Sequence, residues 1–169
     1  RQGIKNSIDY MSRDSQLYVM NESGQVWQGE HIKEAKEHMI DTANDAQNLL
    51  NDKGKENKKI TQNIVFSPPL SAKVKPSDLL DSVRKTLNKK YPNNRFVLGY
   101  HEDKKEHPHV HVVFRIKDTD GKRTDIKKKD LREIRTGFCE ELRLKGYDVK
   151  ATHKQKQGLN QSIREAHDT

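Results

Sequence analysis

Two segments of this chain, residues 95–101 and 109–116, alternate between apolar and other side chains, and this pattern restricts the fold more than any other feature. Successive side chains of a strand point to opposite faces of a sheet. One face would then carry only apolar residues, namely Phe96, Leu98, Tyr100, Val110, Val112, Phe114 and Ile116. Such a face has to be buried, and a slip of one residue would expose one of its two halves. The pattern therefore predicts a hairpin in which His101 lies across from His109.

The opposite face of the predicted hairpin is rich in histidine. Four of the eight histidines of the chain lie in HEDKKEHPHVH, residues 101–111. The pairing would bring His101, His109 and His111 together, and Gly99 would leave space beside them. Three neutral imidazoles form a divalent-metal site with positions open for substrate oxygens. Histidines on a polar strand face can also be merely solvated, but the third histidine across the hairpin favours the metal site.

Two further residues of this segment are candidates for supporting the site. His107, in the turn before Pro108, is expected to assist the ligands rather than to bind the metal. Asp103 is the nearest carboxylate that could orient a ligand imidazole or accept a proton. Imidazole ligands favour zinc, manganese, cobalt or nickel over magnesium. The residues alone do not select one ion.

The remaining apolar periodicity predicts the other elements of the fold. The predicted elements are a helix over 3–11, a hairpin over 17–29, a helix over 32–50, a polar loop over 51–59, a strand over 60–67, a helix from Pro76 to Leu87, a helix over 131–142 that Gly146 stops, a strand over 147–151 and a polar tail from His153. This order predicts one α+β domain over residues 1–169, with a mainly antiparallel central sheet flanked by helices.

Some polar side chains fall where packing does not explain them. On the first predicted helix, Tyr10 points away from the apolar stripe of Ile4, Ile8 and Met11. Most tyrosines in such a position are amphipathic surface residues, and a role as nucleophile is the alternative. The competing tyrosines are less suitable, because Tyr100 faces the core and Tyr91 precedes a proline; Tyr147 remains an alternative. If strand 60–67 joins the same sheet, Asn63 and Ser67 could share the histidine face, although a serine before two prolines is more often a turn former.

Charge and composition narrow the classes of partner. With 33 Lys and Arg against 25 Asp and Glu, the net charge is +8, which favours nucleic acid and, second, an anionic membrane surface. The single cysteine, Cys139, excludes an intramolecular disulfide and a cysteine-based zinc site. Neither a membrane-spanning run nor a signal peptide is visible, so a cytoplasmic location fits best.

Three stretches, IDYMSRD, QNIVFSPP and GYHEDKKEHPHVHVVFR, resemble in this order the three motifs of conjugative relaxases. These enzymes are nicking endonucleases of the HUH superfamily, and the similarity is closest to the T-DNA border endonuclease branch. The later stretch LREIRTGFCEELRLKGYDVKAT resembles the helix and strand that follow the histidine motif in that family. The resemblance spans about residues 4–155 of the chain.

The resemblance implies a fold, a site and a cofactor. It implies the HUH relaxase fold, with about five antiparallel strands and the histidines on the central pair. It also implies that Tyr10 is the nucleophile, that His101, His109 and His111 hold the metal, and that Ser67 contacts DNA near the nick. A divalent ion is expected, Mg²⁺ or Mn²⁺ in use, with Zn²⁺ or Ni²⁺ as alternatives in crystals.

The chain departs from the family pattern in two places. The strand that precedes the tyrosine helix in relatives is absent, so we expect an N-terminal fragment of a longer protein that lacks the first strand. Arg115 stands where close relatives carry asparagine, and we expect it to bind a phosphate. Asn63 and Arg13 are expected to contact DNA as well.

The function implied by the resemblance is a site- and strand-specific transesterase for single-stranded DNA. It would nick the origin of transfer of a mobile element through a 5′-phosphotyrosyl intermediate, rejoin ends and start conjugative transfer. Its expected partners are origin DNA, accessory relaxosome proteins and a type IV secretion coupling protein; it would act as a monomer without membrane contact. The alternatives are an HUH replication initiator or transposase that uses Tyr147, and a non-catalytic DNA-binding module with a structural metal.

Overall fold

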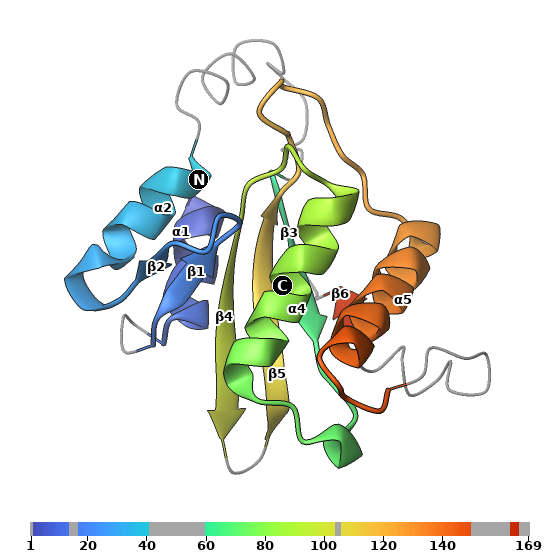
Figure 1. Cartoon of the computed structure of the whole chain (residues 1–169). Coiled ribbons are helices and arrows are strands. Elements are labelled where there is room, and N and C mark those ends of the chain that lie inside the picture. The colour runs from blue at the N-terminus through green and yellow to red at the C-terminus, as the bar shows by residue number, and fades with distance from the viewer. Residues whose placement is uncertain (1, 14–16, 41–59, 104–105, 150–162, 166–169) are drawn as a thin grey trace.

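A computed structural model describes residues 2–13, 17–40, 60–103, 106–149 and 163–165, and these form a six-stranded sheet with helices on both faces (Figure 1). The strands are β1 (Val19–Asn21), β2 (Val26–Trp27), β3 (Thr61–Phe66), β4 (Phe96–Asp103), β5 (Glu106–Arg115) and β6 (Ile163–Glu165). Their order in the sheet is β2-β1-β4-β5-β3-β6, and every neighbouring pair is antiparallel. The predicted α+β class and antiparallel sheet are confirmed.

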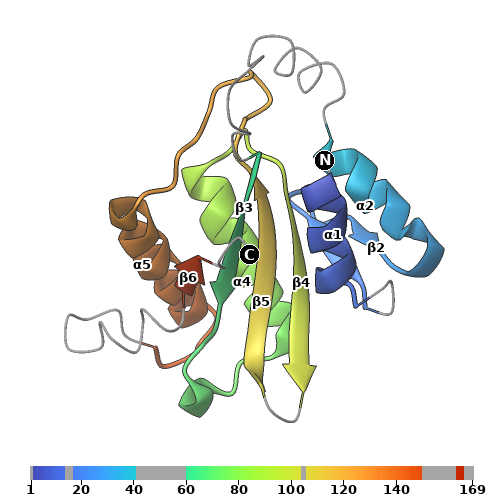
Figure 2. The same cartoon turned by 180° about the vertical axis from the view of Figure 1, so that it is seen from behind.

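The helices divide between the two faces of the sheet. They are α1 (Gln2–Met11), α2 (Ile32–Met39), α4 (Pro76–Lys90) and α5 (Lys128–Leu144), with short 3₁₀ turns η1 (Gly29–His31) and η2 (Leu70–Ala72). Helices α4 and α5 cover one face, and α1 and α2 cover the other, as the views from opposite sides show (Figures 1 and 2). Each face therefore has its own buried apolar cluster.

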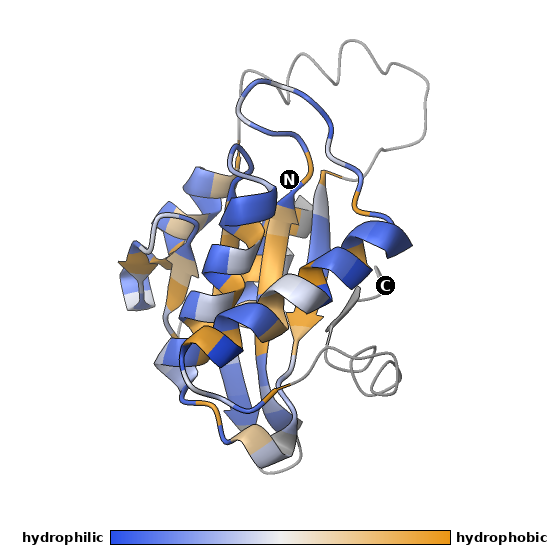
Figure 3. Ribbon diagram, turned by 45° about the vertical axis from the view of Figure 1, so that its right-hand side comes forward, coloured by the Kyte–Doolittle hydropathy of each residue, from blue (hydrophilic) through white to orange (hydrophobic). Residues whose placement is uncertain are grey.

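The hairpin of β4 and β5 has the predicted register. Leu98 pairs with Val112 and His101 pairs with His109. The face that was predicted to be apolar packs on α4 and α5 in the larger cluster, and the strands there are strongly hydrophobic (Figure 3). Val97 and Val113, on the opposite face, pack under α1 and α2. Both faces of the central pair are thus covered over part of their length, which holds these two strands rigidly.

Local signals explain where the helices beneath the sheet begin and end. Pro76 occupies the first turn of α4, where its missing N–H costs nothing, and Lys89 and Lys90 lie in the last turn, where cations suit the helix dipole. Gly146 follows α5 with a φ of 98°, a left-handed conformation that glycine adopts without strain. These boundaries agree with the predicted helices.

The predicted helix over 32–50 is confirmed only for its first part. Helix α2 ends at Met39, because Ile40 is already extended with φ −102° and ψ 128°. Two arginines donate hydrogen bonds to the last carbonyls of α2. Arg95, directly before β4, donates from Nη1 to the His38 carbonyl at 3.1 Å, and Arg115, at the end of β5, donates from Nη1 to the Met39 carbonyl at 3.0 Å. The rest of this prediction, and the loop over 51–59, lie outside the described residues.

The strand predicted over 147–151 is wrong for residues 147–149, the part of it that the structure describes. Residues 147–149 are not in a strand; Tyr147 N–H instead donates to the Leu142 carbonyl at 3.1 Å, which folds the chain back at the end of α5. The last strand is β6, from the segment read as a polar tail, and it pairs with β3. This pairing places β6 at the sheet edge, opposite the edge formed by β2.

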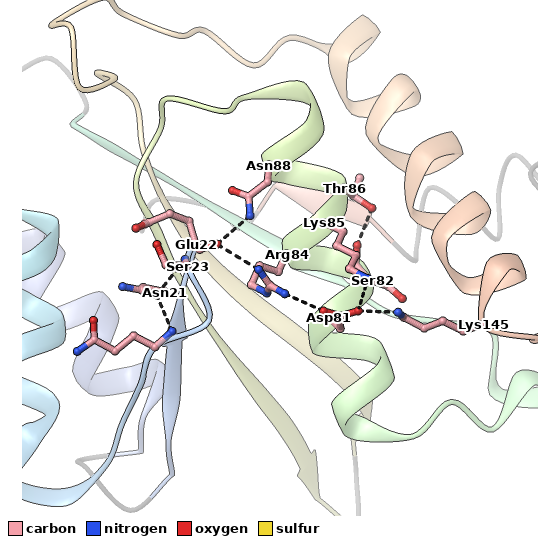
Figure 4. A network of polar contacts seen from close by, with 11 residues as sticks. Asn21, Glu22, Ser23, Asp81, Ser82, Arg84, Lys85, Thr86, Asn88 and Lys145 are labelled. Carbon is pink, nitrogen blue, oxygen red and sulfur yellow. Dashed lines mark hydrogen bonds and ion pairs between the residues drawn. The ribbon is translucent and has the colours of Figure 1, made fainter.

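A polar network ties the turn between β1 and β2 to α4 and to the end of α5 (Figure 4). The Glu22 carbonyl accepts hydrogen bonds from Asn88 at 2.8 Å and Arg84 at 3.4 Å. Asp81 pairs with Arg84 at 2.9 Å and with Lys145 at 2.6 Å.

Within the described residues, none of the helices is long and apolar enough to cross a membrane.

Candidate active site

The hairpin register brings three imidazoles together on the face of the sheet that α1 covers. His101 pairs with His109, and Gly99 pairs with His111. One ligand nitrogen from each of the three histidines lies within 4.8 Å of the others. The ring centroids are 4.6 Å apart for His101 and His111, and 4.7 Å for His109 and His111. Three potential nitrogen ligands therefore converge on one point without any change in the strands.

Hydrogen bonds to backbone carbonyls orient two of these rings. His101 Nε2 contacts the carbonyl oxygen of Met11, and His109 Nδ1 contacts the carbonyl oxygen of His107 at 2.7 Å. A carbonyl can only accept, so each of these nitrogens carries the proton in a neutral ring. The other nitrogen, His101 Nδ1 or His109 Nε2, is then the deprotonated one that suits a metal. Both tautomers follow from backbone positions.

The donor set fits a divalent transition metal. Imidazole nitrogen is a ligand for zinc, manganese, cobalt, nickel or copper, and three such ligands leave coordination positions for other groups. Two of the histidines, His101 and His109, are buried at 1% and 8% exposure, and His111 is partly exposed. A metal held here would thus have two buried ligands, His101 and His109, and one partly exposed ligand, His111.

Tyr10 lies beside this cluster and is exposed. Its ring centroid is 5.6 Å from that of His111 and 6.2 Å from that of His101, in both cases edge-on. The side chain is 66% exposed, although its neighbour Met11 is 1% exposed. An exposed phenol against two imidazoles of a potential metal site is an arrangement for nucleophilic chemistry on a bound substrate.

Helix α1 is held firmly against the sheet. Ile4 and Ile8 are fully buried in the cluster that also contains Val97 and Val113. Asp9 forms an ion pair with Lys36 of α2 at 2.6 Å. Helix α1 ends at Met11, and Arg13, two residues later, has a φ of 50° and is exposed. The Arg13 position is compatible with the DNA contact predicted for it.

Strand β3 places the predicted DNA-contacting residues next to β5. Val65 pairs with His111 and Asn63 pairs with Val113, so the Asn63 side chain points to the histidine face. Among the described residues, the buried Asn63 Oδ1 has no hydrogen-bond partner. Ser67 directly follows β3 and is partly exposed. Strand β3 therefore lies in the expected sheet position, and the roles of both side chains remain predictions.

The structure places three other predicted residues differently or leaves them open. Arg115 is 1% exposed and donates to the last carbonyl of α2, so its guanidinium is used inside the fold, and this burial contradicts the phosphate contact predicted for it. His107 assists His109 through its backbone carbonyl, whereas its imidazole is exposed. Asp103 ends β4, after a register shift that follows His101, and its side chain lies outside the described part of the structure.

The alternative tyrosine lies on the other face of the sheet. Tyr147 packs against the cluster under α4 and α5. Its hydroxyl donates to Asp78 at 2.6 Å and accepts from Lys75 N–H at 3.1 Å. The hydrogen bond to the Asp78 carboxylate raises the pKa of Tyr147, which disfavours its phenolate. The imidazoles and Tyr147 are thus separated by the sheet itself.

Sequence reasoning missed the part that Met11 takes in the site. Met11 was assigned to the apolar stripe of its helix, and its side chain is indeed buried. Its carbonyl, however, is the hydrogen-bond acceptor for His101. No residue type signals a backbone acceptor; only its position, directly after the candidate nucleophile, could have drawn attention to it.

Comparison with known proteins gives two matches. The family model for relaxases, described as the MobA/VirD2-like nuclease domain, matches residues 10–146. Among solved structures, the chain is similar to one described as the conjugative relaxase TrwC in complex with oriT DNA, in a copper-bound form. That similarity has a TM-score of 0.50 and 14% identity, and it covers 99% of this chain and 73% of the other. It shows the fold alone. No curated protein matches the chain significantly.

Proposed function

Because the chain belongs to the MobA/VirD2-like family of relaxase nuclease domains, we propose that it nicks single-stranded DNA at the origin of transfer of a mobile element. One observation carries the proposal beyond family membership: the exposed Tyr10 ring lies edge-on against His101 and His111 of the three-imidazole cluster. A nucleophile and a potential metal site therefore share one surface, where a phosphodiester could reach both.

The chemistry assigned to the site is a transesterification. The Tyr10 hydroxyl oxygen attacks phosphorus, the bond to the 3′-oxygen breaks, and a 5′-phosphotyrosyl link and a free 3′-hydroxyl remain. The phenol loses its proton, for which Asp103 is the proposed acceptor, and the leaving 3′-oxygen gains one. The phosphodiester energy is kept in the new link, so the reverse attack by a 3′-hydroxyl rejoins the ends.

His101, His109 and His111 would hold a divalent cation, Mg²⁺ or Mn²⁺ in use. When bound, such an ion withdraws charge from a non-bridging phosphate oxygen and stabilises the transition state. The role of the protein is to orient the imidazoles and to keep them partly buried. Since the ligands come from adjacent strands, their mutual positions depend on the sheet rather than on loops.

The substrate is proposed to be unpaired at the nick. A phosphodiester within a duplex cannot bend into a site formed by a helix end and a sheet face, whereas a single strand can. Arg13, Asn63 and Ser67 are the proposed DNA contacts around Tyr10. Accessory relaxosome proteins, a type IV secretion coupling protein and a cytoplasmic location are proposed by analogy with the family.

Two alternatives are less well supported. An initiator or transposase that uses a downstream tyrosine would need Tyr147 at the metal, yet its hydroxyl contacts Asp78 on the opposite face. A non-catalytic module with a structural metal would be expected to close the metal site with a fourth protein ligand. In the described part of the chain, the cluster of potential ligands contains the three histidines and no further Cys, Asp or Glu.

The test is covalent-adduct formation with a single-stranded origin oligonucleotide and Mn²⁺. We expect a covalent protein–DNA species for the wild type, its loss when Mn²⁺ is chelated, and its complete loss in Tyr10→Phe, because the attacking oxygen is absent. Tyr10→Phe should leave folding and DNA affinity nearly unchanged, since this side chain is 66% exposed.

The matched control is Tyr147→Phe, which removes a hydroxyl on the far face. This variant should form the adduct at a rate close to that of the wild type. If Tyr10→Phe still forms the adduct while Tyr147→Phe does not, the assignment of the nucleophile is wrong. If neither the wild type nor any variant forms the covalent adduct with any of several origin sequences, the nicking function itself is refuted.

A further inference from the structure

Met11 connects the helix that carries Tyr10 to the strand that carries His101. It is the last residue of α1 and directly follows the tyrosine. Its carbonyl accepts a hydrogen bond from His101 Nε2, and its side chain is buried at 1% exposure. Met11 thus contacts β4 through both its backbone and its side chain, while the preceding residue, Tyr10, exposes its phenol to solvent.

Gly99 is the position on β4 over which the Met11 side chain lies. A Cβ atom on Gly99 would fall 2.9 Å from Met11 Cγ, 3.5 Å from Sδ and 3.6 Å from the Met11 carbonyl oxygen. Real Cβ atoms essentially never approach another heavy atom to 2.9 Å, so a side chain here would force the Met11 side chain, or the end of α1 with it, to shift. The expected space beside the imidazoles is therefore occupied by Met11.

The backbone of Gly99 does not itself require glycine. Its φ lies outside the left-handed range, and it pairs regularly with His111 in the centre of the sheet. Glycine inside a regular strand is unfavourable, because it adds backbone entropy to the unfolded chain and packs no side chain. The close approach of another chain segment is the remaining reason for a glycine at this point.

We propose that Met11 and Gly99 are a positioning pair that sets the distance between the nucleophile and the metal ligands. The bare backbone at Gly99 lets Met11 seat on the sheet, and this seating brings the Met11 carbonyl to His101 and Tyr10 to the edge of the cluster. The pair touches neither substrate nor metal and acts through Tyr10 and His101. The inference rests on the proposed nicking function and adds residues to it.

Gly99→Ala tests the contact, and Met11→Ala tests the seating side chain. In Gly99→Ala the Met11 side chain has to leave its present seat on β4, which removes what holds the helix end in place, and a misplacement of Tyr10 by about 1 Å can reduce a rate by about 100-fold. We expect a fall of that order in adduct formation with Mn²⁺. Met11→Ala keeps the carbonyl but removes the seating side chain, and a smaller loss, about tenfold, is expected.

The double variant Gly99→Ala/Met11→Ala distinguishes positioning from general damage. Here the new methyl group occupies part of the volume that Met11 vacates, so the adduct rate should recover to within about tenfold of the wild type. Independent damage would instead multiply the two losses to about 1,000-fold. If Gly99→Ala fails to fold, the comparison of the double variant with Met11→Ala still decides, since positioning predicts no additional loss.

Gly137→Ala is the matched control on the other face of the sheet. A Cβ there would lie 3.3 Å from Thr86 Cγ2, a tight contact between α5 and α4 that is remote from Tyr10. Its adduct rate should equal that of the wild type. An equal loss in Gly137→Ala and Gly99→Ala would mean that crowding anywhere in the core disturbs the site, and would overturn the proposal.

A second measurement does not depend on catalysis. Long-range ¹H–¹⁵N spectra of the imidazoles in metal-free protein report which ring nitrogen carries the proton. His101 should be the Nε2–H tautomer in the wild type and the double variant, and a mixture of tautomers in Gly99→Ala. A single Nε2–H tautomer and an unchanged adduct rate in Gly99→Ala would refute the positioning pair while leaving nicking intact. Absence of any wild-type adduct would instead refute the nicking function, and the tautomer result would still stand.

Discussion

At the scale of single residues, the candidate site depends on backbone carbonyls as much as on side chains. His101 and His109 are each oriented by a carbonyl oxygen, from Met11 and His107 respectively. A carbonyl holds one tautomer of the ring without adding a charge near the candidate metal site. Substituting the side chain of Met11 or His107 leaves its backbone carbonyl in place. Mutations of the proposed ligands should therefore have larger effects than mutations of these supporting residues.

This separation gives a prediction for the four histidines of the hairpin. His109→Ala and His111→Ala should each abolish measurable Mn²⁺ binding and nicking, and His101→Ala should be close behind, because each removes one of the three proposed ligands. His107→Ala should lower Mn²⁺ affinity by about tenfold or less, since its supporting contact is made by the backbone. Calorimetric titration with Mn²⁺ measures all four variants.

His31, an exposed histidine that pairs with Glu34, is the matched control for this series. His31→Ala should bind Mn²⁺ like the wild type. Unchanged affinity in His111→Ala would eliminate the proposed metal site, and a loss in His107→Ala as large as that in His109→Ala would assign the His107 imidazole to the ligands.

At the scale of elements, the two faces of the sheet have separate tasks. Helices α1 and α2 cover the histidine face, and α1 ends at the imidazole cluster with Tyr10 and Met11. Helices α4 and α5 close the larger apolar cluster on the other face. The interface of α4 with its surroundings is also polar, through the Asp81–Lys145 pair and the hydrogen bonds of Arg84 and Asn88 to the Glu22 carbonyl (Figure 4).

Asp81 gives this interface a pH dependence that can be measured. Burial by itself raises the pKa of Asp81, but hydrogen bonds from Lys145, Lys85 and Arg84 outweigh it and lower the pKa from 3.8 to about 2. Because the folded-state pKa is depressed, the stabilisation is complete above the unfolded value of 3.8 and is lost as the pH falls through about 2.

Asp81→Asn should therefore lower the free energy of unfolding by about 1–2 kcal/mol at pH 6–7, after allowance for partial exposure. The difference between the two proteins should shrink as the pH decreases from about 4 to 2. Urea unfolding of both proteins at several pH values checks this, and a difference that is constant over that range would show that Asp81 contributes through packing instead.

At the scale of the whole molecule, the chain has a net charge of +8, but its basic residues are not equally available to bind phosphate. The basic residues at the end of α4 contact carboxylates: Lys89 pairs with Glu141 at 2.5 Å, and Lys90 pairs with Glu133. The exposed Lys128 and Lys129 begin α5 within the basic stretch 122–135. Phosphate contacts are thus expected more from that stretch than from residues 84–90; the basic stretch 53–59 lies outside the described residues.

Binding to an origin oligonucleotide should accordingly depend strongly on salt. With about 0.7 released counterions per phosphate contact on single strands and four to seven contacts, the slope of log affinity against log salt should be about −3 to −5. Lys128→Gln/Lys129→Gln should reduce that slope by about 1. Lys89→Gln/Lys90→Gln, the matched pair on α4, should change it little. Fluorescence anisotropy from low to moderate salt measures all three proteins, and a slope near zero would mean that the basic residues of the chain do not contact DNA phosphates.

The amino-acid sequence by itself determined the central hairpin, the three-histidine cluster and Tyr10 as candidates. It could do so because alternation along β4 and β5 allows one register, and register alone decides which side chains meet across two strands. It also predicted the class of sheet and the starts and ends of α4 and α5, whose signals are local in the chain.

Only the tertiary structure decided the features that join distant segments. Arg115 was expected on the DNA surface, but the end of α2 takes its guanidinium, because a helix terminus needs donors for its last carbonyls. Strand β6 comes from a tail without an apolar pattern, since pairing with β3 uses backbone groups that every residue carries. The seating of Met11 on Gly99 likewise depends on how closely α1 approaches β4, a distance between segments far apart in sequence that no local pattern encodes.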